Sequence, residues 1–183
     1  CPVLTVAGTN GKGSTVAVAE AVAQACGMLT GQFTSPHFLR FNERIRVGGH
    51  EADDSEIVAA FEQIDAARDG TSLTYFEFAA LAALLIFRQR GVELAILEVG
   101  LGGRLDAVNI VDPSVAVITS IDLDHQDWLG DDLDSIAREK AGILRAGIPA
   151  VIADPTPPAG LEQAVTDSGA HPFYLGDKFD FDE

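Results

Sequence analysis

The sequence predicts an α/β fold, a P-loop-type and mostly parallel sheet with helices on both faces. Short apolar runs alternate with helix-length segments along the chain, which is the pattern of parallel strands joined by helical crossovers. Two runs, Leu94–Leu97 and Val115–Thr119, are continuously apolar, as expected of strands that are buried on both faces. The first run, Val3–Ala7, leads into a glycine-rich turn that contains a lysine.

The segment between the first strand and the two central strands predicts three helices, a strand and a hairpin. Two adjacent glycines after an apolar run indicate the hairpin turn. Asp53 or Asp54 is the expected N-cap of the second helix. In order, the elements are a helix at Ser14–Cys26, a strand at Thr30–Thr34, a hairpin begun by Arg44–Val47, an amphipathic helix at Ser55–Arg68 and a strongly apolar helix at Thr74–Arg90.

The segment after the central strands continues the alternation of helices and strands. No internal repeat and no low-complexity stretch interrupts it. The expected elements are a helix at Leu133–Arg145, a strand at Ala150–Ala153, a helix at Leu161–Ser168 and a strand at Pro172–Leu175.

The composition excludes several classes of function. The 183 residues carry a formal net charge of −16, which argues against binding to nucleic acid or to an anionic membrane. An anionic substrate must therefore be held by local cations or by a metal. Cys1 and Cys26 cannot form a disulfide framework, and no apolar run approaches the ~18 residues of a membrane span. We expect a cytoplasmic protein.

The glycine-rich loop at 8–14 predicts a phosphate-binding site. A strand, a loop and a helix in this order leave free backbone N–H groups at a helix N-terminus, and Lys12 adds a positive charge. The loop departs from the strict P-loop pattern, because Gly13 separates Lys12 from Ser14 and no glycine lies five positions before Gly11. A tight strand–helix turn without a ligand is the alternative.

Polar residues follow the ends of the predicted strands, where ligands bind in such sheets. Glu98 is placed like a Mg²⁺ ligand after a buried strand; the alternative is a salt bridge within the loop. Ser35 is either a hydroxyl ligand or a turn residue before a proline. His125 lies beside Asp122 and Asp124 and is either a ligand or general base, or an ordinary loop histidine.

Lys140 lies on the apolar stripe of its predicted helix, between Ile136 and Leu144. A buried ammonium group is costly unless it is paired. Its side chain therefore extends to solvent, reaches a carboxylate, or loses its proton and becomes a reactive amine. Arg104, in a second glycine-rich loop, either meets an anionic substrate or forms a loop salt bridge, for example with Asp106.

Six strings, which cover most of residues 3–152, resemble the folylpolyglutamate synthase/dihydrofolate synthase family, a branch of the Mur ligases. They occur in one order, and together they are far more specific than any one alone. In that superfamily the phosphate loop reads G-T-N-G-K, which accounts for its irregular spacing here. The strings are VAGTNGKGST, FTSPHFLRFNERIRV, TYFEFAALAALLIF, LEVGLGGRLDAVN, ITSIDLDHQDWLG and IAREKAGILRAGIPAV.

The resemblance implies an ADP-forming ligase. ATP phosphorylates the carboxylate of dihydropteroate or a folate, and the amine of L-glutamate then displaces the phosphate. The resemblance also implies two Mg²⁺ sites, with Ser35 and Glu98 at one and His125 at the other, a carbamylated Lys140, and catalytic roles for Lys12, His125 and Lys140. It assigns the phosphates to Thr9, Asn10, Gly11, Lys12, Gly13 and Ser14, and the pteroate pocket to Thr74, Tyr75, Phe76, Glu77, Leu105, Asp106 and Ala107.

The resemblance further implies that residues 1–183 are a truncated central ATPase domain. An N-terminal segment and a C-terminal glutamate-ligase domain are then absent, and these residues alone are expected to show no ligase turnover. The implied partners are small molecules, with no nucleic acid and no membrane, and the implied state is a monomer. Two alternatives remain: a Mur-type amino-acid ligase acting on another carboxylate, and a non-catalytic nucleotide-binding fragment.

Overall fold

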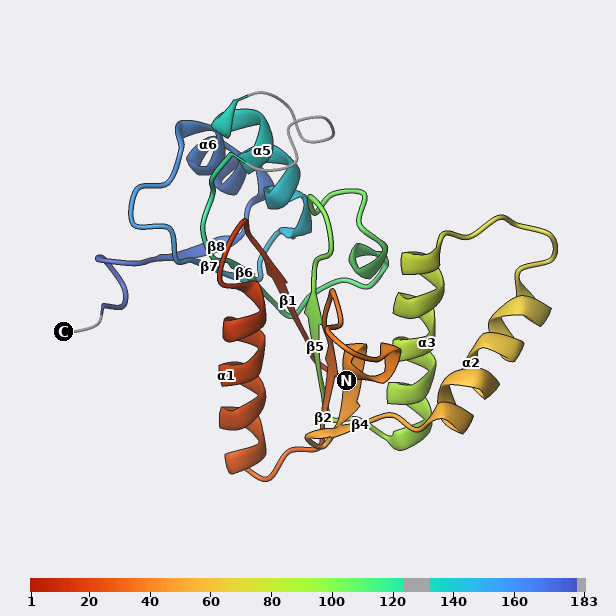
Figure 1. The fold of residues 1–183 in the computed structure, drawn as a ribbon. Helices are drawn as coiled ribbons and strands as arrows, with labels where there is room; N and C mark the ends of the chain where they lie inside the picture. The colour runs from red at the N-terminus through yellow and green to blue at the C-terminus, as the bar shows by residue number, and fades with distance from the viewer. Residues whose placement is uncertain (124–131, 181–183) are drawn as a thin grey trace.

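The fold is an α/β sheet structure, which a computed structural model describes for residues 1–123 and 132–180 (Figure 1). The described part contains an eight-stranded sheet of order β4-β3-β2-β5-β1-β6-β7-β8. Its pairs are parallel except β2–β3 and β3–β4, which confirms both the mostly parallel sheet and the hairpin. The strands are β1 (Val3–Ala7), β2 (Thr30–Phe33), β3 (Ile45–Val47), β4 (His50–Glu51), β5 (Leu94–Glu98), β6 (Val115–Ile118), β7 (Pro149–Ile152) and β8 (His171–Tyr174).

Helices cover both faces of this sheet, as predicted. Helix α1 lies on one side of the central strands, and α2 and α3 lie on the other (Figure 1). Within the described ranges, no helix is long and apolar enough to cross a membrane. The helices are α1 (Lys12–Ala25), α2 (Asp54–Ala67), α3 (Tyr75–Arg90), α5 (Leu133–Lys140) and α6 (Ala159–Ser168), with 3₁₀ segments η1 (Phe41–Arg44), η2 (Ala107–Ile110) and η3 (Ala141–Ile143).

Side-chain caps set the starts of α2 and α3. Asp53 and Glu56 form a capping box at the start of α2. Thr74 and Glu77 form the corresponding pair at the start of α3, where the Glu77 N–H donates to the Thr74 hydroxyl at 3.2 Å. Such caps satisfy N–H groups that have no partner inside the helix. Gly91 ends α3 in the left-handed conformation, with φ of 67°.

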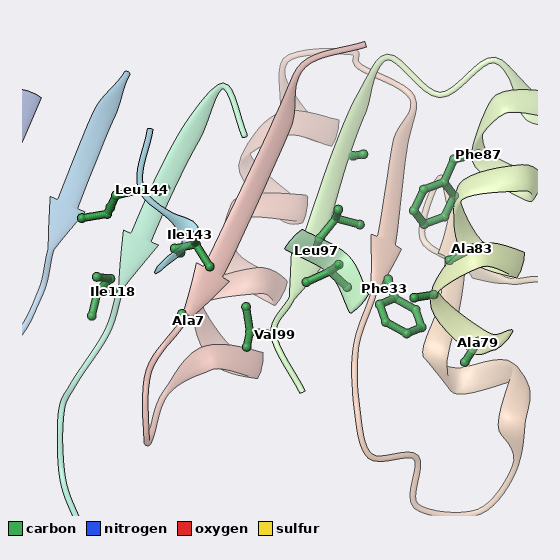
Figure 2. Packing of buried hydrophobic residues seen from close by; sticks show 14 of the residues in the cluster. Ala7, Phe33, Ala79, Ala83, Phe87, Leu97, Val99, Ile118, Ile143 and Leu144 are labelled. Carbon is green, nitrogen blue, oxygen red and sulfur yellow. The ribbon is translucent and has the colours of Figure 1, made fainter. Parts of the chain in front are cut away.

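Small residues let α3 approach the sheet closely. Ala79 and Ala83 are fully buried and face Phe33 and Leu97 of the central strands (Figure 2). A side chain at Gly31 of β2 would lie 2.7 Å from the ring of Phe87. The small side chains of α3 therefore hold the start of this helix beside the ends of β2 and β5.

The predicted helix at 133–145 is wrong in its C-terminal part. Helix α5 ends at Lys140, and η3 continues the chain to Ile143. Gly142 lies so close to the glycine-rich loop after β5 that a Cβ there would be 2.3 Å from the Cβ of Arg104. This contact with a distant loop was not visible in the sequence. Lys140 is therefore the last residue of α5, not the middle of a longer helix.

Candidate active site

The site is built at the edge of the sheet where four parallel strands end. Strands β1, β2, β5 and β6 run parallel, so the loops that follow them meet at this edge. The phosphate loop connects β1 to α1. Gly8 has φ of 148° and Gly11 has φ of 84°, and both values lie where L side chains rarely occur.

The N–H groups of the loop divide into two sets. Those of Thr9 and Asn10 donate to the carbonyl and the hydroxyl of Ser120, at 2.7 and 3.1 Å. Within residues 1–123 and 132–180, the N–H groups at positions 11–14 have no hydrogen-bond acceptor. Four free donors at the start of a 14-residue helix form an anion site. The free N–H groups at positions 11–14 are therefore suited to a phosphate, while Thr9 and Asn10 fix the loop.

Two lysines converge on the carbonyl oxygen of Gly8. The Nζ of Lys12 donates to it at 2.9 Å and also to the Thr9 carbonyl at 3.2 Å. The Nζ of Lys140 donates to the same Gly8 oxygen at 3.1 Å. Lys140 is only 4% exposed, so its side chain does not extend to solvent, which was one of the three alternatives. The structure thus brings together Lys12 and Lys140, which are far apart in the sequence.

Glu98 and Ser35 also meet at this edge. The Glu98 carboxylate is 5% exposed, and its Oε2 accepts the Ser35 N–H at 3.1 Å. Its Oε1 lies 3.9 Å from where a Cβ on Gly13 would be, beside the first turn of α1. Burial raises the pKa of Glu98, while the Ser35 N–H and the charge of Lys12 act in the opposite direction.

These groups fit a magnesium ion that is shared with a phosphate. In the described ranges no cluster of three or more His, Cys, Asp or Glu residues could hold a metal alone. Mg²⁺ favours one or two carboxylates, together with water and phosphate oxygens. Glu98, with Ser35 bonded to it through the backbone N–H, supplies that kind of partial site. His125 and Asp124 lie outside the described residues, so the second metal site stays a prediction.

A cavity of about 760 Å³ adjoins the phosphate loop, and Lys12 and Ser35 are part of its wall. The cavity brings together all seven residues that the resemblance assigned to a pteroate pocket. The structure adds Arg44 and Glu139, which sequence reasoning did not select. The pocket residues that were predicted and that line the cavity are Thr74, Tyr75, Phe76, Glu77, Leu105, Asp106 and Ala107.

Two carboxylates of this cavity organise the backbone. Asp106 accepts N–H groups from Gly100, Leu101 and Val108, each at 3.0 Å. Burial raises the pKa of Asp106, against the lowering effect of these N–H groups. Glu77 accepts the N–H of its own cap residue at 2.6 Å. These two acids therefore shape the pocket, while its aromatic and aliphatic side chains supply surface for a flat ligand.

The glycine-rich loop after β5 packs directly on the end of α5. Arg104 pairs with Glu139, with 3.0 Å between Nε and Oε2, so the suggested pair with Asp106 is wrong. A Cβ on Gly103 would lie 2.8 Å from the carbonyl oxygens of Glu139 and Lys140. The glycine thus permits the close approach that positions Lys140.

We expect Gly103→Ala to destabilise the fold by about 1–3 kcal/mol, the usual cost of overpacking. The added methyl group would push the end of α5 away from the loop. Urea denaturation measures the change, with Gly13→Ala as the control because its Cβ would make only an ordinary contact at 3.9 Å. Equal stability of the two variants would show that the loop does not hold α5.

Comparison with known proteins assigns the chain to a family. The Mur ligase middle domain matches residues 6–153. The dihydrofolate synthase/folylpolyglutamate synthase of Escherichia coli K12 is 52% identical over 168 residues, which are 92% of this chain and 40% of that protein. The chain therefore spans less than half the length of this relative.

Solved structures agree in fold and in coverage. Escherichia coli FolC in complex with DHPP and ADP superposes with a TM-score of 0.96 at 49% identity, covering 98% of this chain and 43% of that one. The bifunctional folylpolyglutamate synthase/dihydrofolate synthase of Yersinia pestis, complexed with AMPPNP and Mn ion, gives 0.95 at 50% identity, covering 99% and 44%. On these matches, the chain belongs to the Mur ligase family, and residues 6–153 are its middle domain.

Proposed function

We propose that this chain is the nucleotide-binding and acyl-substrate-binding part of an ATP-dependent ligase that joins L-glutamate to dihydropteroate, to folates or to both. The observation that carries the proposal is the junction of two sites: the free N–H groups at 11–14 and the 760 Å³ cavity meet at Lys12. Two relatives with this fold were solved with ADP or AMPPNP. The residues beyond this part of the relatives would complete the enzyme.

The proposed reaction has two steps. A carboxylate oxygen of the acyl substrate attacks the γ-phosphorus of ATP, the bond to the β–γ bridging oxygen breaks, and ADP leaves. The amine of glutamate then attacks the acyl carbon, inorganic phosphate leaves, and the amine loses a proton. Both substrates of the first step are anions, so cations must bring them together. Positions 11–14 hold the phosphates, Lys12 neutralises them, and a divalent ion at Glu98 would add Lewis-acid charge.

The position of Lys140 supports the predicted carbamate. Two ammonium groups that donate to the same Gly8 oxygen repel each other. Carbamylation of Lys140 would replace one cation by an anion that attracts Lys12 and is suited to a metal. We propose this modification, with a second metal near His125. Intact mass measured at neutral pH with and without added bicarbonate tests it, because the carbamate adds CO₂ to one lysine.

Binding and turnover test the proposed function separately. We expect this chain to bind ATP with Mg²⁺ and to bind dihydropteroate, but to release no ADP from them with glutamate. Joined to the remaining segments of a relative, it should release ADP with dihydropteroate or tetrahydrofolate, and the preference identifies the activity. Binding of a UDP-sugar carboxylate in place of dihydropteroate would favour another Mur-type ligase. Nucleotide binding without any acyl substrate would favour a non-catalytic module.

We expect Glu98→Gln to act in opposite directions on stability and on metal dependence. Burial raises the pKa of Glu98, so the folded chain without metal loses stability as pH rises from the unfolded value of about 4.3 through the folded one. The neutral amide removes that loss and raises the thermal midpoint at pH 7. It should also remove most of the effect of Mg²⁺ on ATP affinity, about tenfold or more.

Glu93→Gln is the matched control for this prediction. Glu93 directly precedes the first residue of β5, at the opposite end of the strand from Glu98, and accepts the Leu29 N–H at 2.8 Å. It should leave the Mg²⁺ dependence of ATP binding intact. A Glu98→Gln chain whose ATP affinity still responds fully to Mg²⁺ would remove Glu98 from the metal site.

A further inference from the structure

Arg44 is a buried cation in the wall of the substrate cavity. It is 8% exposed and is the last residue of η1, directly before β3. Its Nε donates to Nδ1 of His37 at 2.8 Å. Its guanidinium lies 5.3 Å from the ring centroid of Tyr75 and 6.0 Å from that of Phe41. In the described part of the chain, its remaining four N–H donors have no protein acceptor, and no carboxylate lies within ion-pair distance of it.

The acidic groups of the same cavity are already engaged elsewhere. Glu139 pairs with Arg104, and Asp106 accepts three backbone N–H groups. Glu77 accepts the N–H of its own cap residue. None of these three carboxylates in the cavity wall therefore pairs with Arg44.

Arg44 as a residue is buried, but its guanidinium nitrogens without a protein acceptor border the cavity rather than being sealed in the core. Removing a charge from bulk water without giving it a partner is costly. Stacking on the rings of Tyr75 and Phe41 compensates only part of this cost. A guanidinium presents parallel donors that match the two oxygens of a carboxylate. The arrangement is thus that of a site for an anionic ligand whose carboxylate completes it.

The phosphates of ATP have other donors, namely positions 11–14 and Lys12. The backbone of Arg44 is held next to the loop that follows β2, because the Arg44 carbonyl accepts the N–H of Thr34 at 3.0 Å. Thr34 directly precedes Ser35, whose N–H binds Glu98. The backbone of Arg44 is therefore tied to the segment that carries Ser35, and both residues line the same cavity as Lys12.

We propose that Arg44 binds the carboxylate of the acyl substrate and holds it beside the nucleotide for phosphoryl transfer. This inference rests on the proposed function and adds one residue to it. It separates two tasks: the aromatic and aliphatic wall holds the body of the ligand, and Arg44 selects the acid over its neutral analogues.

Isothermal titration of the 183-residue chain with pteroate and with its carboxamide tests the assignment. The carboxamide differs only at the group that Arg44 is proposed to bind. We expect the unmodified chain to prefer the acid. Arg44→Gln should weaken pteroate binding about 10- to 100-fold, the usual effect of a lost charge-assisted hydrogen bond, and should leave carboxamide binding unchanged. Arg44→Lys, which keeps the charge but loses the fork, should fall between them.

Arg40→Gln is the matched control, because Arg40 lies directly before η1, is 61% exposed and pairs with Glu51 and Asp54 at the surface. It should change neither affinity. The inference is overturned if a folded Arg44→Gln chain loses affinity for both pteroate and the carboxamide, or for neither of them. It is also overturned if the unmodified chain binds the acid and the amide equally well. Binding of L-glutamate that depends on Arg44 would assign the anion to the amino acid and overturn it too.

The proposed function fails in a different way. An unmodified chain that binds neither pteroate nor the carboxamide rejects the acyl-substrate site itself. A chain that binds both equally keeps the site and rejects only the role of Arg44. Thermal melting of each variant without ligand shows which comparisons are made on folded protein.

Discussion

Lys12→Met should nearly abolish binding of ATP and of inorganic triphosphate, by about 100-fold or more. The methionine keeps the apolar stem and removes the only part of the side chain that reaches a phosphate. The ammonium group of Lys12 lies against the loop and donates hydrogen bonds to the carbonyls of Gly8 and Thr9 at 2.9 and 3.2 Å. When a phosphate binds, we expect these contacts to be exchanged for bonds to phosphate oxygens, and charge-assisted bonds of this kind contribute about 1.5–3 kcal/mol each.

Triphosphate is the more direct probe, because it needs no adenine site. Fluorescence competition with a labelled ATP measures both ligands at fixed Mg²⁺. Lys178→Met is the control, since Lys178 lies near the far end of the described chain and pairs with Asp177 at 3.5 Å. If Lys12→Met binds triphosphate as the unmodified chain does, the loop is a structural turn and the nucleotide site must lie elsewhere.

Local patterns were sufficient to predict most of the fold. Continuous apolar runs identified the central strands, and the cap at Thr74 and the glycine at 91 mark the ends of α3. Errors arose where distant segments touch. The end of the predicted helix at 145 depended on the contact between Gly142 and Arg104, and the position of Glu98 as the last residue of β5 depended on pairing with β1.

The candidate site likewise contains residues that a short sequence window predicts and residues that only the folded structure shows. A glycine-rich loop with Lys12, or an acid after a buried strand, is visible in one short window. Arg44 was missed because nothing near it in the sequence shows that it is buried or that Tyr75 lies under it. Ser120 was missed for a similar reason, since its bonds to Thr9 and Asn10 join loops about 110 residues apart. The burial of Arg44, unlike that of Lys140 on its apolar helix stripe, becomes a signal only when the surrounding structure is known.

The part of the phosphate loop most sensitive to change is expected to be Gly8. Its carbonyl accepts both Lys12 and Lys140, so its position couples the loop to the end of α5. A Cβ on Gly8 would lie 1.8 Å from Oγ1 of Thr119, and its φ of 148° is one that L side chains rarely adopt. We expect Gly8→Ala to lower the free energy of unfolding by about 3–5 kcal/mol through overpacking and backbone strain together.

Urea denaturation with triphosphate titration measures both consequences. Gly27→Ala is the control for strain alone, because its φ is 82° and its Cβ would have no neighbour within 4 Å; it should cost about 1 kcal/mol. Adding Thr119→Ala to Gly8→Ala removes the closest atom but leaves the Thr119 backbone N 3.1 Å away, so rescue should be partial. If the Gly8→Ala chain is as stable as the Gly27→Ala chain and binds triphosphate as before, the loop can shift away from Thr119 without cost. The shared carbonyl could then not couple the two lysines.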